Sequence, residues 1–458
     1  MIKKWLFNGT NFFTQKQNSI ISAAVVLMFT VLASRILGLV RDRLLSSTFF
    51  GGQEWQLDVY FAAFRIPDMI FQLLVMGALS AAFIPVFSSS LKHKIEEAWE
   101  ITNGCINLAS LVFIIFSVVV YIFAKPLSNL IAPEFNEQKI VLMVSLTRIM
   151  LLSQFFFIIS NFFTGILQSN QRFLLPAIAP VLYNIGIIFG IIFLAPVYGI
   201  YGPVYGVVIG AFLHLIVQYP LVKKLGYHYK FVLGINLKGV RKIIKLMLPR
   251  TLGLGVNQIE YTFAVFLATG MAAGSLSIFY FSQHLQALPV GLFGLTFGQA
   301  ALPMLSQEGE NAEKSEKFKN LFSASLKQIF YFALPASVLL LVLRVPLVRI
   351  VFGAKEFPWE ATLLTAKVVA AFSLSVVAQA AIQLLVRAFY AIQDTKTPLF
   401  IASLSVIINV FFSWFLVTQI NLGVVGLGLA ISLASLVQFL VLFFVLHQKV
   451  QCFNLFSL

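Results

Sequence analysis

The stretch Ser19–Ser46, SIISAAVVLMFTVLASRILGLVRDRLLS, decides the fold class. It is long and apolar enough to cross a bilayer as a helix, which takes about 20 apolar residues. Its second half nevertheless carries Arg35, Arg41, Asp42 and Arg43. A charged side chain at the bilayer centre costs roughly 2.5–3.5 kcal/mol on insertion scales. The stretch therefore predicts a membrane-spanning helix whose charges face water, a partner or a ligand.

The rest of the chain has the same character. Of its 458 residues, 59% are hydrophobic and 11% are charged, and the mean hydropathy is +0.92. Soluble domains average about 25% charged residues, so a soluble enzyme and a disordered regulator are both excluded. Apolar runs recur as far as Leu446, which leaves room for roughly a dozen membrane spans.

These runs predict an all-α polytopic membrane protein with about twelve transmembrane helices. Strands of a membrane barrel alternate apolar and polar residues, whereas these runs are apolar on every side. A helix also satisfies its own backbone hydrogen bonds in lipid. The predicted spans are residues 19–46, 57–88, 102–131, 140–168, 173–196, 201–222, 248–272, 274–306, 322–353, 359–390, 397–419 and 422–447.

The distribution of basic residues predicts the orientation. Twenty Lys and Arg residues fall on the side of the N-terminus, and three, Lys125, Lys139 and Lys355, fall on the other side. Because basic residues collect in cytoplasmic loops, both termini are expected in the cytoplasm, with residues 1–18 and 449–458 as short cytoplasmic segments. The same rule accounts for the net charge of +15 without any nucleic-acid partner.

The two halves of the chain repeat the same motifs. SRILGL at residues 34–39 is echoed by PRTLGL at residues 249–254, and Pro176 is echoed by Pro398. The offset is 215 residues for the first pair and 222 for the second, so it stays nearly constant along the chain. This predicts two pseudo-symmetric lobes of six helices each, with a substrate site between them near mid-membrane. The predicted lobes are residues 19–225 and 248–448.

Residues 226–247 form the predicted linker between the lobes. In it, apolar Val240 and Ile243 interleave with basic Arg241 and Lys245. This pattern predicts an amphipathic cytoplasmic helix that lies on the anionic inner leaflet.

Charged side chains cluster in the first two predicted spans. Arg35 and Asp42 lie close to one helical face because they are seven residues apart, and Arg41 is less well aligned. The second span adds Asp58 and Arg65. A guanidinium group can bind a phosphate bidentately, so three arginines that converge would suit a diphosphate. The alternative is that these charges form salt bridges within the protein.

The second half offers fewer candidates. His284 and Gln283 occupy the place that the repeat pairs with Arg65, so His284 is expected either to support the anion site or to pack as a hydrogen-bonded structural residue. Glu260 and Asp394 are candidates for holding a coupling cation, Na⁺ or H⁺. A hydrogen-bonded structural carboxylate is the alternative for Glu260.

Signals for catalysis are missing from the sequence. It contains no P-loop, GxSxG or HExxH motif, and Cys105 and Cys452 are too far apart for a metal or redox motif. We therefore expect no enzyme activity, no metal and no cofactor other than a coupling cation.

Several motifs closely resemble those of the MurJ/MviN family of lipid II flippases. The specific ones lie in the first two predicted helices, and two later motifs strengthen the match. They are SRILGLVRD at residues 34–42, AFRIPD at 63–68, GALSAAFIP at 77–85, PVGLFG at 289–294 and DTKTP at 394–398. The resemblance covers nearly the whole chain. It implies a fold of the MOP exporter type, in which two six-helix lobes surround a central cavity.

The resemblance also implies a function and a site. The function is movement of the undecaprenyl-diphosphate-linked peptidoglycan precursor, lipid II, across the bacterial plasma membrane by alternating access, for cell-wall synthesis. The cavity arginines of the family match Arg35 and Arg41, and Arg65 matches a basic position. The expected partners are lipid II, membrane lipids and proteins of cell-wall synthesis. The implied diphosphate site is Arg35, Arg41, Arg65 and His284, with Ser34, Asp42, Asp58 and Gln283 supporting or gating it.

The sequence departs from the family in two places. Some well-known members have a further arginine pair and a glutamate in helix 2, where this chain has Phe71, Gln72 and Met76. Their Asp-Arg pair in helix 8 is replaced by Gln283 and His284. The predicted cavity is therefore less charged than theirs.

Two other functions remain open from the sequence. An exporter of the same fold could carry a drug or another polyprenyl-linked oligosaccharide, although three arginines favour an anionic cargo. A non-transporting membrane scaffold that recruits cell-wall enzymes would not depend on charge in the cavity.

Overall fold

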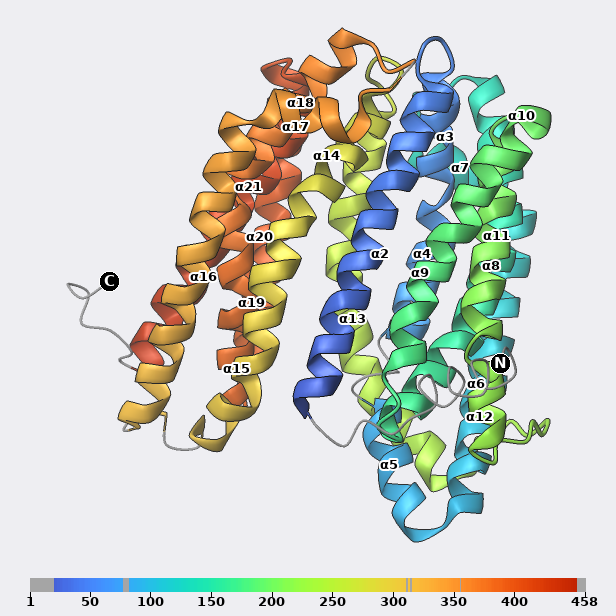
Figure 1. The fold of residues 1–458 in the computed structure, drawn as a ribbon, viewed down its shortest axis with the longest axis vertical. Helices are drawn as coiled ribbons and strands as arrows, with labels where there is room; N and C mark the ends of the chain where they lie inside the picture. Colours follow the sequence, from blue (N-terminus) through green and yellow to red (C-terminus); the bar gives the residue numbers. More distant parts are fainter. Residues whose placement is uncertain (1–19, 77–81, 310–311, 314, 355, 451–458) are drawn as a thin grey trace, which may run out of the picture. The chain divides into compact units, whose positions relative to one another are not determined.

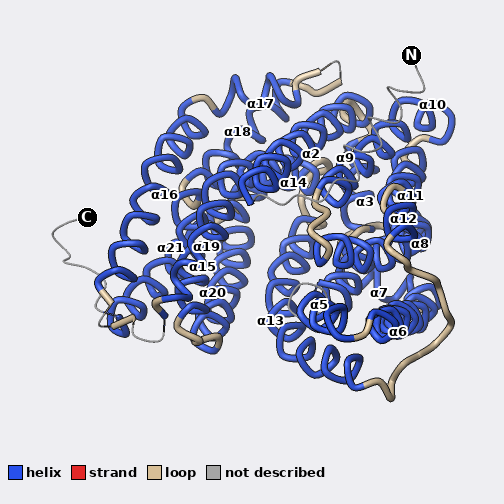
Figure 2. The backbone as a smooth tube through the Cα atoms, turned by 60° about the horizontal axis from the view of Figure 1, so that its bottom comes forward, coloured by secondary structure: helices blue, strands red, loops and turns tan. Residues whose placement is uncertain are grey.

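The computed structural model describes residues 20–76, 82–309, 312–313, 315–354 and 356–450. Within these residues every regular element is a helix and no strand occurs (Figures 1 and 2). The all-α prediction is therefore confirmed for this part of the chain. The terminal segments predicted at 1–18 and beyond 450, and the first part of the GALSAAFIP motif, lie outside the described residues.

The chain divides into two compact units. The first runs to Thr48 and continues over Trp55–Gln258, and the second comprises Phe49–Glu54 and the chain from Ile259 onward. The division at Gln258 falls inside helix α13, which is later in the chain than the predicted linker at 226–247. The boundaries of that linker and of the two lobes stay a prediction.

The first unit contains the helices up to α13. Most of them follow one another with short breaks, and π-helical segments (η) continue α4 and α9. The elements are α2 (Ile20–Phe49), α3 (Glu54–Ala63), α4 (Arg65–Phe71), η1 (Gln72–Met76), α5 (Ile84–His93), α6 (Ile95–Ile122), α7 (Ala124–Ile131), α8 (Glu137–Ser169), α9 (Leu174–Phe189), η3 (Gly190–Leu194), α10 (Ala195–Tyr198), α11 (Tyr201–Ile216), α12 (Tyr219–Lys224) and α13 (Lys238–Ala268).

The second unit has a similar order of helices, with fewer short helices and with its breaks at different places. The end of α13 is followed by α14 (Ser275–Pro289), η4 (Val290–Leu295), α15 (Thr296–Gln307), α16 (Glu316–Val342), α17 (Arg344–Phe352), α18 (Trp359–Ser373), α19 (Val376–Ala391), α20 (Lys396–Trp414), η6 (Phe415–Gln419) and α21 (Gly423–Val450).

In the described residues, each of the twelve predicted spans coincides with one helix or with several consecutive helices. Among the described residues, eight helical runs are long and apolar enough to cross a membrane, and a ninth is α18 with α19, which bend by 42° at their junction. The membrane character of the fold is thus confirmed, and the count of twelve stays a prediction.

The backbone supports the predicted repeat through its left-handed residues. Gln171 (φ 58°) follows α8, and Gln393 (φ 60°) follows α19 at an offset of 222 residues. Gly199 (φ 56°) and Asn421 (φ 60°) have the same offset. Such residues end helices because their conformation lets a backbone N–H reach back to an unpaired carbonyl. The repeat is therefore present in the turns as well as in the motifs.

Helices α9 and α11 of the first unit pack backbone to backbone. A Cβ atom added to Gly186 would lie 2.4 Å from the Cα atom of Gly210, and one added to Gly206 would lie 2.8 Å from the carbonyl oxygen of Gly186. Only glycine allows this approach, which is a common way for membrane helices to associate. The contact fixes α9, which carries one side of the polar site described below.

The second unit has a core of the usual side-chain type. Leu305, Phe322, Leu385 and Leu446 are fully buried and belong to one cluster that joins α15, α16, α19 and α21. This core holds α19, which carries the polar residues of the second unit.

The loop between α12 and α13 is fastened to α6. The side-chain amide of Asn103 donates a hydrogen bond to the carbonyl oxygen of His228, and that of Asn107 donates to the carbonyl oxygens of Lys230 and Val232. The basic stretch predicted as an interfacial helix begins after this loop and is the first part of α13, continuous with the part predicted as a span at residues 248–272. It does not form a separate helix, because no turn or proline interrupts the backbone before Pro249.

Candidate substrate-binding site

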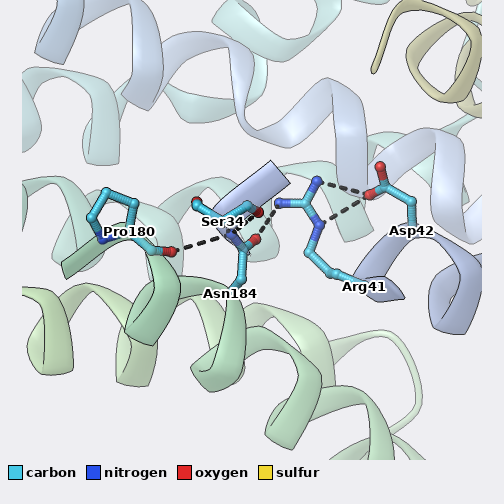
Figure 3. A network of polar contacts seen from close by, with 5 residues as sticks. All are labelled: Ser34, Arg41, Asp42, Pro180 and Asn184. Carbon is cyan, nitrogen blue, oxygen red and sulfur yellow. Dashed lines mark hydrogen bonds and ion pairs between the residues drawn. The ribbon is translucent and has the colours of Figure 1, made fainter. Parts of the chain in front are cut away.

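Arg41 is the centre of a polar network in the first unit. Its Nε and Nη2 atoms donate to Oδ1 of Asp42 at 3.0 and 2.8 Å, and its Nη1 atom donates to Oδ1 of Asn184 at 3.3 Å (Figure 3). The Arg41 side chain is 18% exposed and that of Asp42 is 1% exposed. The alternative of an internal salt bridge is therefore realised for Arg41, within a network that also leaves part of the guanidinium group accessible.

Asn184 links helix α2 to helix α9. Its amide nitrogen donates to the carbonyl oxygen of Ser34 at 3.2 Å and to Oγ of Ser34 at 3.4 Å, while its amide oxygen faces Arg41 (Figure 3). A further hydrogen bond to the carbonyl oxygen of Pro180 holds the amide on its own helix. Because Arg41 uses three of its five N–H groups in these contacts, Asp42 and Asn184 fix the plane of the guanidinium group and leave two N–H groups to bind an anion.

Arg65 lies at a break between two short helices. It is the first residue of α4, after Phe64 has ended α3, and it is 5% exposed. Its Nη2 atom donates to the side-chain oxygen and to the carbonyl oxygen of Gln258, on α13. The sequence predicted a cationic residue deep in the span. The structure shows Arg65 buried in the protein and adds Gln258 as the group that positions it, while its place in the membrane and in the site stays a prediction.

The other predicted residues of the first unit occupy different surroundings. Arg35 is exposed on α2, and Asp58 is buried at 4% exposure on α3. An exposed Arg35 is accessible to an anion, whereas a buried Asp58 suits a supporting role. Both assignments to the site stay predictions.

In the second unit the predicted His284 and Gln283 are half-buried on α14. The imidazole ring of His284 lies 6.3 Å from the ring of Tyr280, one helical turn earlier. This packing agrees with the structural alternative for His284, and its role toward an anion stays a prediction.

Amide side chains are the polar groups that the sequence analysis missed. Gln286 donates to Oε1 of Gln379 at 2.9 Å, and Arg387 donates to the carbonyl oxygen and to Oε1 of Gln383 at 2.6 and 3.2 Å. The signal was present, because Gln379, Gln383 and Arg387 are spaced by four and lie on one face of α19. Asn184 and Gln258 gave no such signal, since each is a single amide in an apolar run.

The two carboxylates proposed for a coupling cation differ in position. Asp394 lies in the turn between α19 and α20, where it accepts hydrogen bonds from the backbone N–H and the hydroxyl of Thr397 and pairs with Lys449. Burial alone would raise the pKa of Asp394, but the bonds from Lys449 and Thr397 outweigh it and lower the pKa to about 2. Glu260 is half-buried within α13. No group of three His, Cys, Asp or Glu side chains arranged for a metal occurs in the described part of the chain.

The sequence of the chain matches one known family of membrane proteins. The family model described as lipid II flippase MurJ matches residues 45–457. The chain belongs to this family. The matched range includes Arg65 and begins just after Arg41 and Asp42, so the assignment of those two residues rests on the SRILGLVRD motif and on the geometry above.

Individual relatives agree with the family match. A probable lipid II flippase MurJ of Buchnera aphidicola from Schizaphis graminum is 30% identical over 443 residues, which cover 94% of this chain and 84% of the relative. A solved structure of lipid II flippase MurJ in an inward closed conformation is 27% identical, with a TM-score of 0.79 over 92% of this chain and 87% of the other. An inward-facing MATE family transporter of the MOP superfamily is 15% identical, with a TM-score of 0.74 over 93% of this chain and 98% of the other. The last match shows a shared fold alone, and together they confirm the MOP exporter fold.

Proposed function

We propose that this protein moves lipid II across the bacterial inner membrane, and that Arg41 and Arg65 bind the diphosphate of the cargo. Membership of the MurJ family supports the function, and the family is one of transporters, not of enzymes. The observation that carries the site is the guanidinium group of Arg41, held at three N–H groups by Asp42 and Asn184. A group that is already oriented loses less conformational entropy when it binds an anion.

Asp42 gives this site a property that a flippase needs. The carboxylate neutralises most of the charge of Arg41, so the cargo meets a donor with correct geometry and reduced net charge. A site that bound the cargo tightly in both the inward-facing and the outward-facing state would release it slowly. Such a site would also not favour either state, because only a difference in affinity between the two states shifts their equilibrium. Exposed Arg35 and buried Arg65 supply the further positive charge toward the diphosphate, and His284 keeps the supporting role that the sequence predicts for it.

The orientation and the energy source complete the proposal. Both termini lie in the cytoplasm, as the imbalance of basic residues predicts, and α13 begins at the inner leaflet. Glu260 is the candidate for coupling to Na⁺ or H⁺, because it is a carboxylate within a membrane-spanning helix. Asp394 is less suited to that role, since Lys449 and Thr397 already satisfy it.

The test is transfer of labelled lipid II between leaflets in vesicles that contain the purified protein. Wild-type protein should move lipid II and should not move phosphatidylcholine. Arg41→Ala should slow transfer by about 10-fold or more, since a charge-assisted hydrogen bond contributes roughly 1.5–3 kcal/mol.

Arg344→Ala is the matched control, because it removes one arginine from an exposed position in the second unit, where Nη1 donates to the carbonyl oxygen of Leu341. Transfer by the control should equal that of the wild type. Transfer that survives Arg41→Ala and Arg65→Ala would reject the site. If correctly folded wild-type protein does not transfer lipid II, the proposed function is rejected in favour of another cargo or a scaffold.

A further inference from the structure

The first unit contains a cavity away from the Arg41 network. It has a volume of about 610 Å³ and lies where the end of α6 and the start of α7 meet α8. Four of the side chains that line it are polar or aromatic, namely Tyr121, Lys125, Ser145 and Arg148. The others are apolar, namely Val141, Val144 and Ile149. A cavity with both kinds of surface suits a molecule with a polar head and an apolar tail.

Arg148 is fixed in this cavity by the end of helix α6. Its Nε and Nη2 atoms donate to the carbonyl oxygen of Tyr121 at 3.2 and 3.0 Å, and its guanidinium carbon lies 4.4 Å from the centre of the Tyr121 ring. The carbonyl of Tyr121 belongs to the last turn of α6, where carbonyl groups have no partner within the helix. Two of the five N–H groups of Arg148 are used in this way, which leaves three that can donate to an anion in the cavity.

Two more donors line the same space. The hydroxyl of Tyr201 donates to Oγ of Ser145 at 3.0 Å, so the hydroxyl hydrogen of Ser145 is left to donate to another acceptor. Lys125 pairs with Glu137 at 2.6 Å, but both side chains are more than half exposed. Such exposed pairs contribute only about 0–1 kcal/mol, so the ammonium group can exchange Glu137 for an anion at little cost.

We infer that this cavity binds the phosphate headgroup of an anionic phospholipid. Arg148, Ser145 and Lys125 donate to the phosphate oxygens, and the first part of the lipid tail contacts Val141, Val144 and Ile149. The apolar part of the cavity favours a phospholipid over a free phosphate. Val141 and Tyr121 line the cavity and are exposed, so they can contact an acyl chain, which a free phosphate does not have. With the termini in the cytoplasm, as proposed, the lipid belongs to the outer leaflet. Binding itself does not depend on that orientation or on the transport of lipid II.

The test is native mass spectrometry of the purified full chain with phosphatidylglycerol. Arg148→Gln should weaken binding by about 10-fold, as expected for the loss of a charge-assisted contact, and Lys125→Gln by about 2-fold to 3-fold. Because Arg148 also caps α6, a second variant is needed that leaves the cap intact. Val144→Trp fills the cavity without changing any charge, and it should weaken binding by at least about 5-fold.

Lys139→Gln is the matched control. Lys139 is a cation on the same helix, α8, but its ammonium group lies over the ring of Phe135 and does not line the cavity. The control should bind phosphatidylglycerol within about 2-fold of the wild type, since the ammonium group of Lys139 is not among the groups that line the cavity. If Lys139→Gln weakens binding as much as Arg148→Gln, or if Val144→Trp binds normally, the cavity is not the site.

Two further ligands identify the source of the phosphate. Inorganic phosphate at millimolar concentration should leave phosphatidylglycerol bound, and displacement by it would overturn the assignment to a lipid. Undecaprenyl phosphate should bind more weakly than phosphatidylglycerol at this site, and tighter binding that Val144→Trp abolishes would overturn the assignment to a phospholipid. Because none of these measurements uses lipid II, their failure leaves the proposed transport function unaffected.

Discussion

The two units share an order of helices but differ in the chemistry of their polar interiors. In the first unit a buried carboxylate and a guanidinium group form an ion pair, between Asp42 and Arg41, on α2. In the second unit neutral amide side chains contact one another, as between Gln286 and Gln379. The repeated backbone therefore does not require repeated charges. The turns and π segments preserve the fold, while the side chains have diverged toward different tasks.

The largest expected effect is the difference in stability between variants of Arg41, in the first unit, and Arg387, in the second unit. Arg41→Ala breaks the ion pair with buried Asp42, and breaking a buried ion pair typically costs about 3–5 kcal/mol. Arg387→Ala removes a residue whose described partner is the neutral Gln383, so it should cost no more than about 1–3 kcal/mol. Thermal unfolding of both variants in detergent measures the difference.

A double variant shows whether stability and transport depend on Arg41 for the same reason. Arg41→Met with Asp42→Asn removes both charges, so it should recover most of the stability lost in Arg41→Ala. Its transfer of lipid II should remain low, because no guanidinium group faces the cargo. Recovery of transport together with stability would mean that Arg41 has only a structural role.

The second comparison concerns helix packing at two glycines, Gly206 in the first unit and Gly428 in the second, which are 222 residues apart and correspond in the repeat. A Cβ atom at Gly206 would lie 2.8 Å from a backbone oxygen and 2.9 Å from a backbone Cα, so helix α9 or α11 must shift. A Cβ atom at Gly428 would lie 3.1 Å from the Cβ of Ala371, and this contact can relax more easily. Gly206→Ala should therefore destabilise the protein by about 1–3 kcal/mol and Gly428→Ala by less than about 1 kcal/mol.

The same melting experiment decides this comparison. Equal shifts in melting temperature for Gly206→Ala and Gly428→Ala would show that the backbone contact between α9 and α11 is looser than the structure indicates. A larger shift for Gly206→Ala with normal binding of lipid II would confirm that the contact supports the fold alone.

Sequence reasoning found the helices and the charged residues more easily than the contacts between them. The apolar runs located the helices, including the eight or nine runs of the described residues that are long and apolar enough to cross a membrane, since hydrophobic length is a local property. Motifs also placed Arg41, Asp42 and Arg65 near one another in the chain. Asn184, the partner of Arg41, is about 140 residues away in the chain, and Gln258, the partner of Arg65, is about 190 residues away. A single amide in an apolar helix forms no local sequence pattern from which its partner could be predicted. The continuity of α13 was missed for a similar reason, because a change from amphipathic to apolar sequence marks the membrane surface and does not by itself end a helix.

The third comparison uses two asparagines, each six residues before a π segment. Asn184 precedes η3 and bonds Arg41, Ser34 and Pro180, whereas Asn409 precedes η6 and receives a single long bond, of 3.5 Å, from Ser413. Asn184→Ala should cost about 1–3 kcal/mol because it leaves buried polar partners unsatisfied. Asn409→Ala should cost less than half of that. A cost at Asn409 as large as that at Asn184 would indicate a polar partner for Asn409 that the described contacts do not include.

The smallest expected effect lies in the turns that end α8 and α19. Both turns use the same hydrogen bonds, from the N–H of Arg172 to the carbonyl of Leu167 and from the N–H of Asp394 to the carbonyl of Phe389. Their side chains differ in charge, and Asp394 pairs with Lys449 at the end of α21. The pKa of Asp394 is lowered to about 2, below the value of about 3.9 for an unfolded chain.

The sign of this shift fixes the pH dependence. Because the folded state holds the carboxylate more strongly than the unfolded state does, the stabilisation is complete above about pH 5 and is lost as the pH falls toward 2. The ion pair is partly exposed, so the whole effect should not exceed about 1 kcal/mol. Asp394→Asn should lower the melting temperature slightly at pH 6, and at pH 3 only about half of that difference should remain. Arg172→Gln should show no such convergence, because an arginine stays charged over this range. If the difference between wild type and Asp394→Asn is the same at both pH values, the carboxylate is not held by Lys449, and the backbone hydrogen bonds maintain the turn at Gln393 without it.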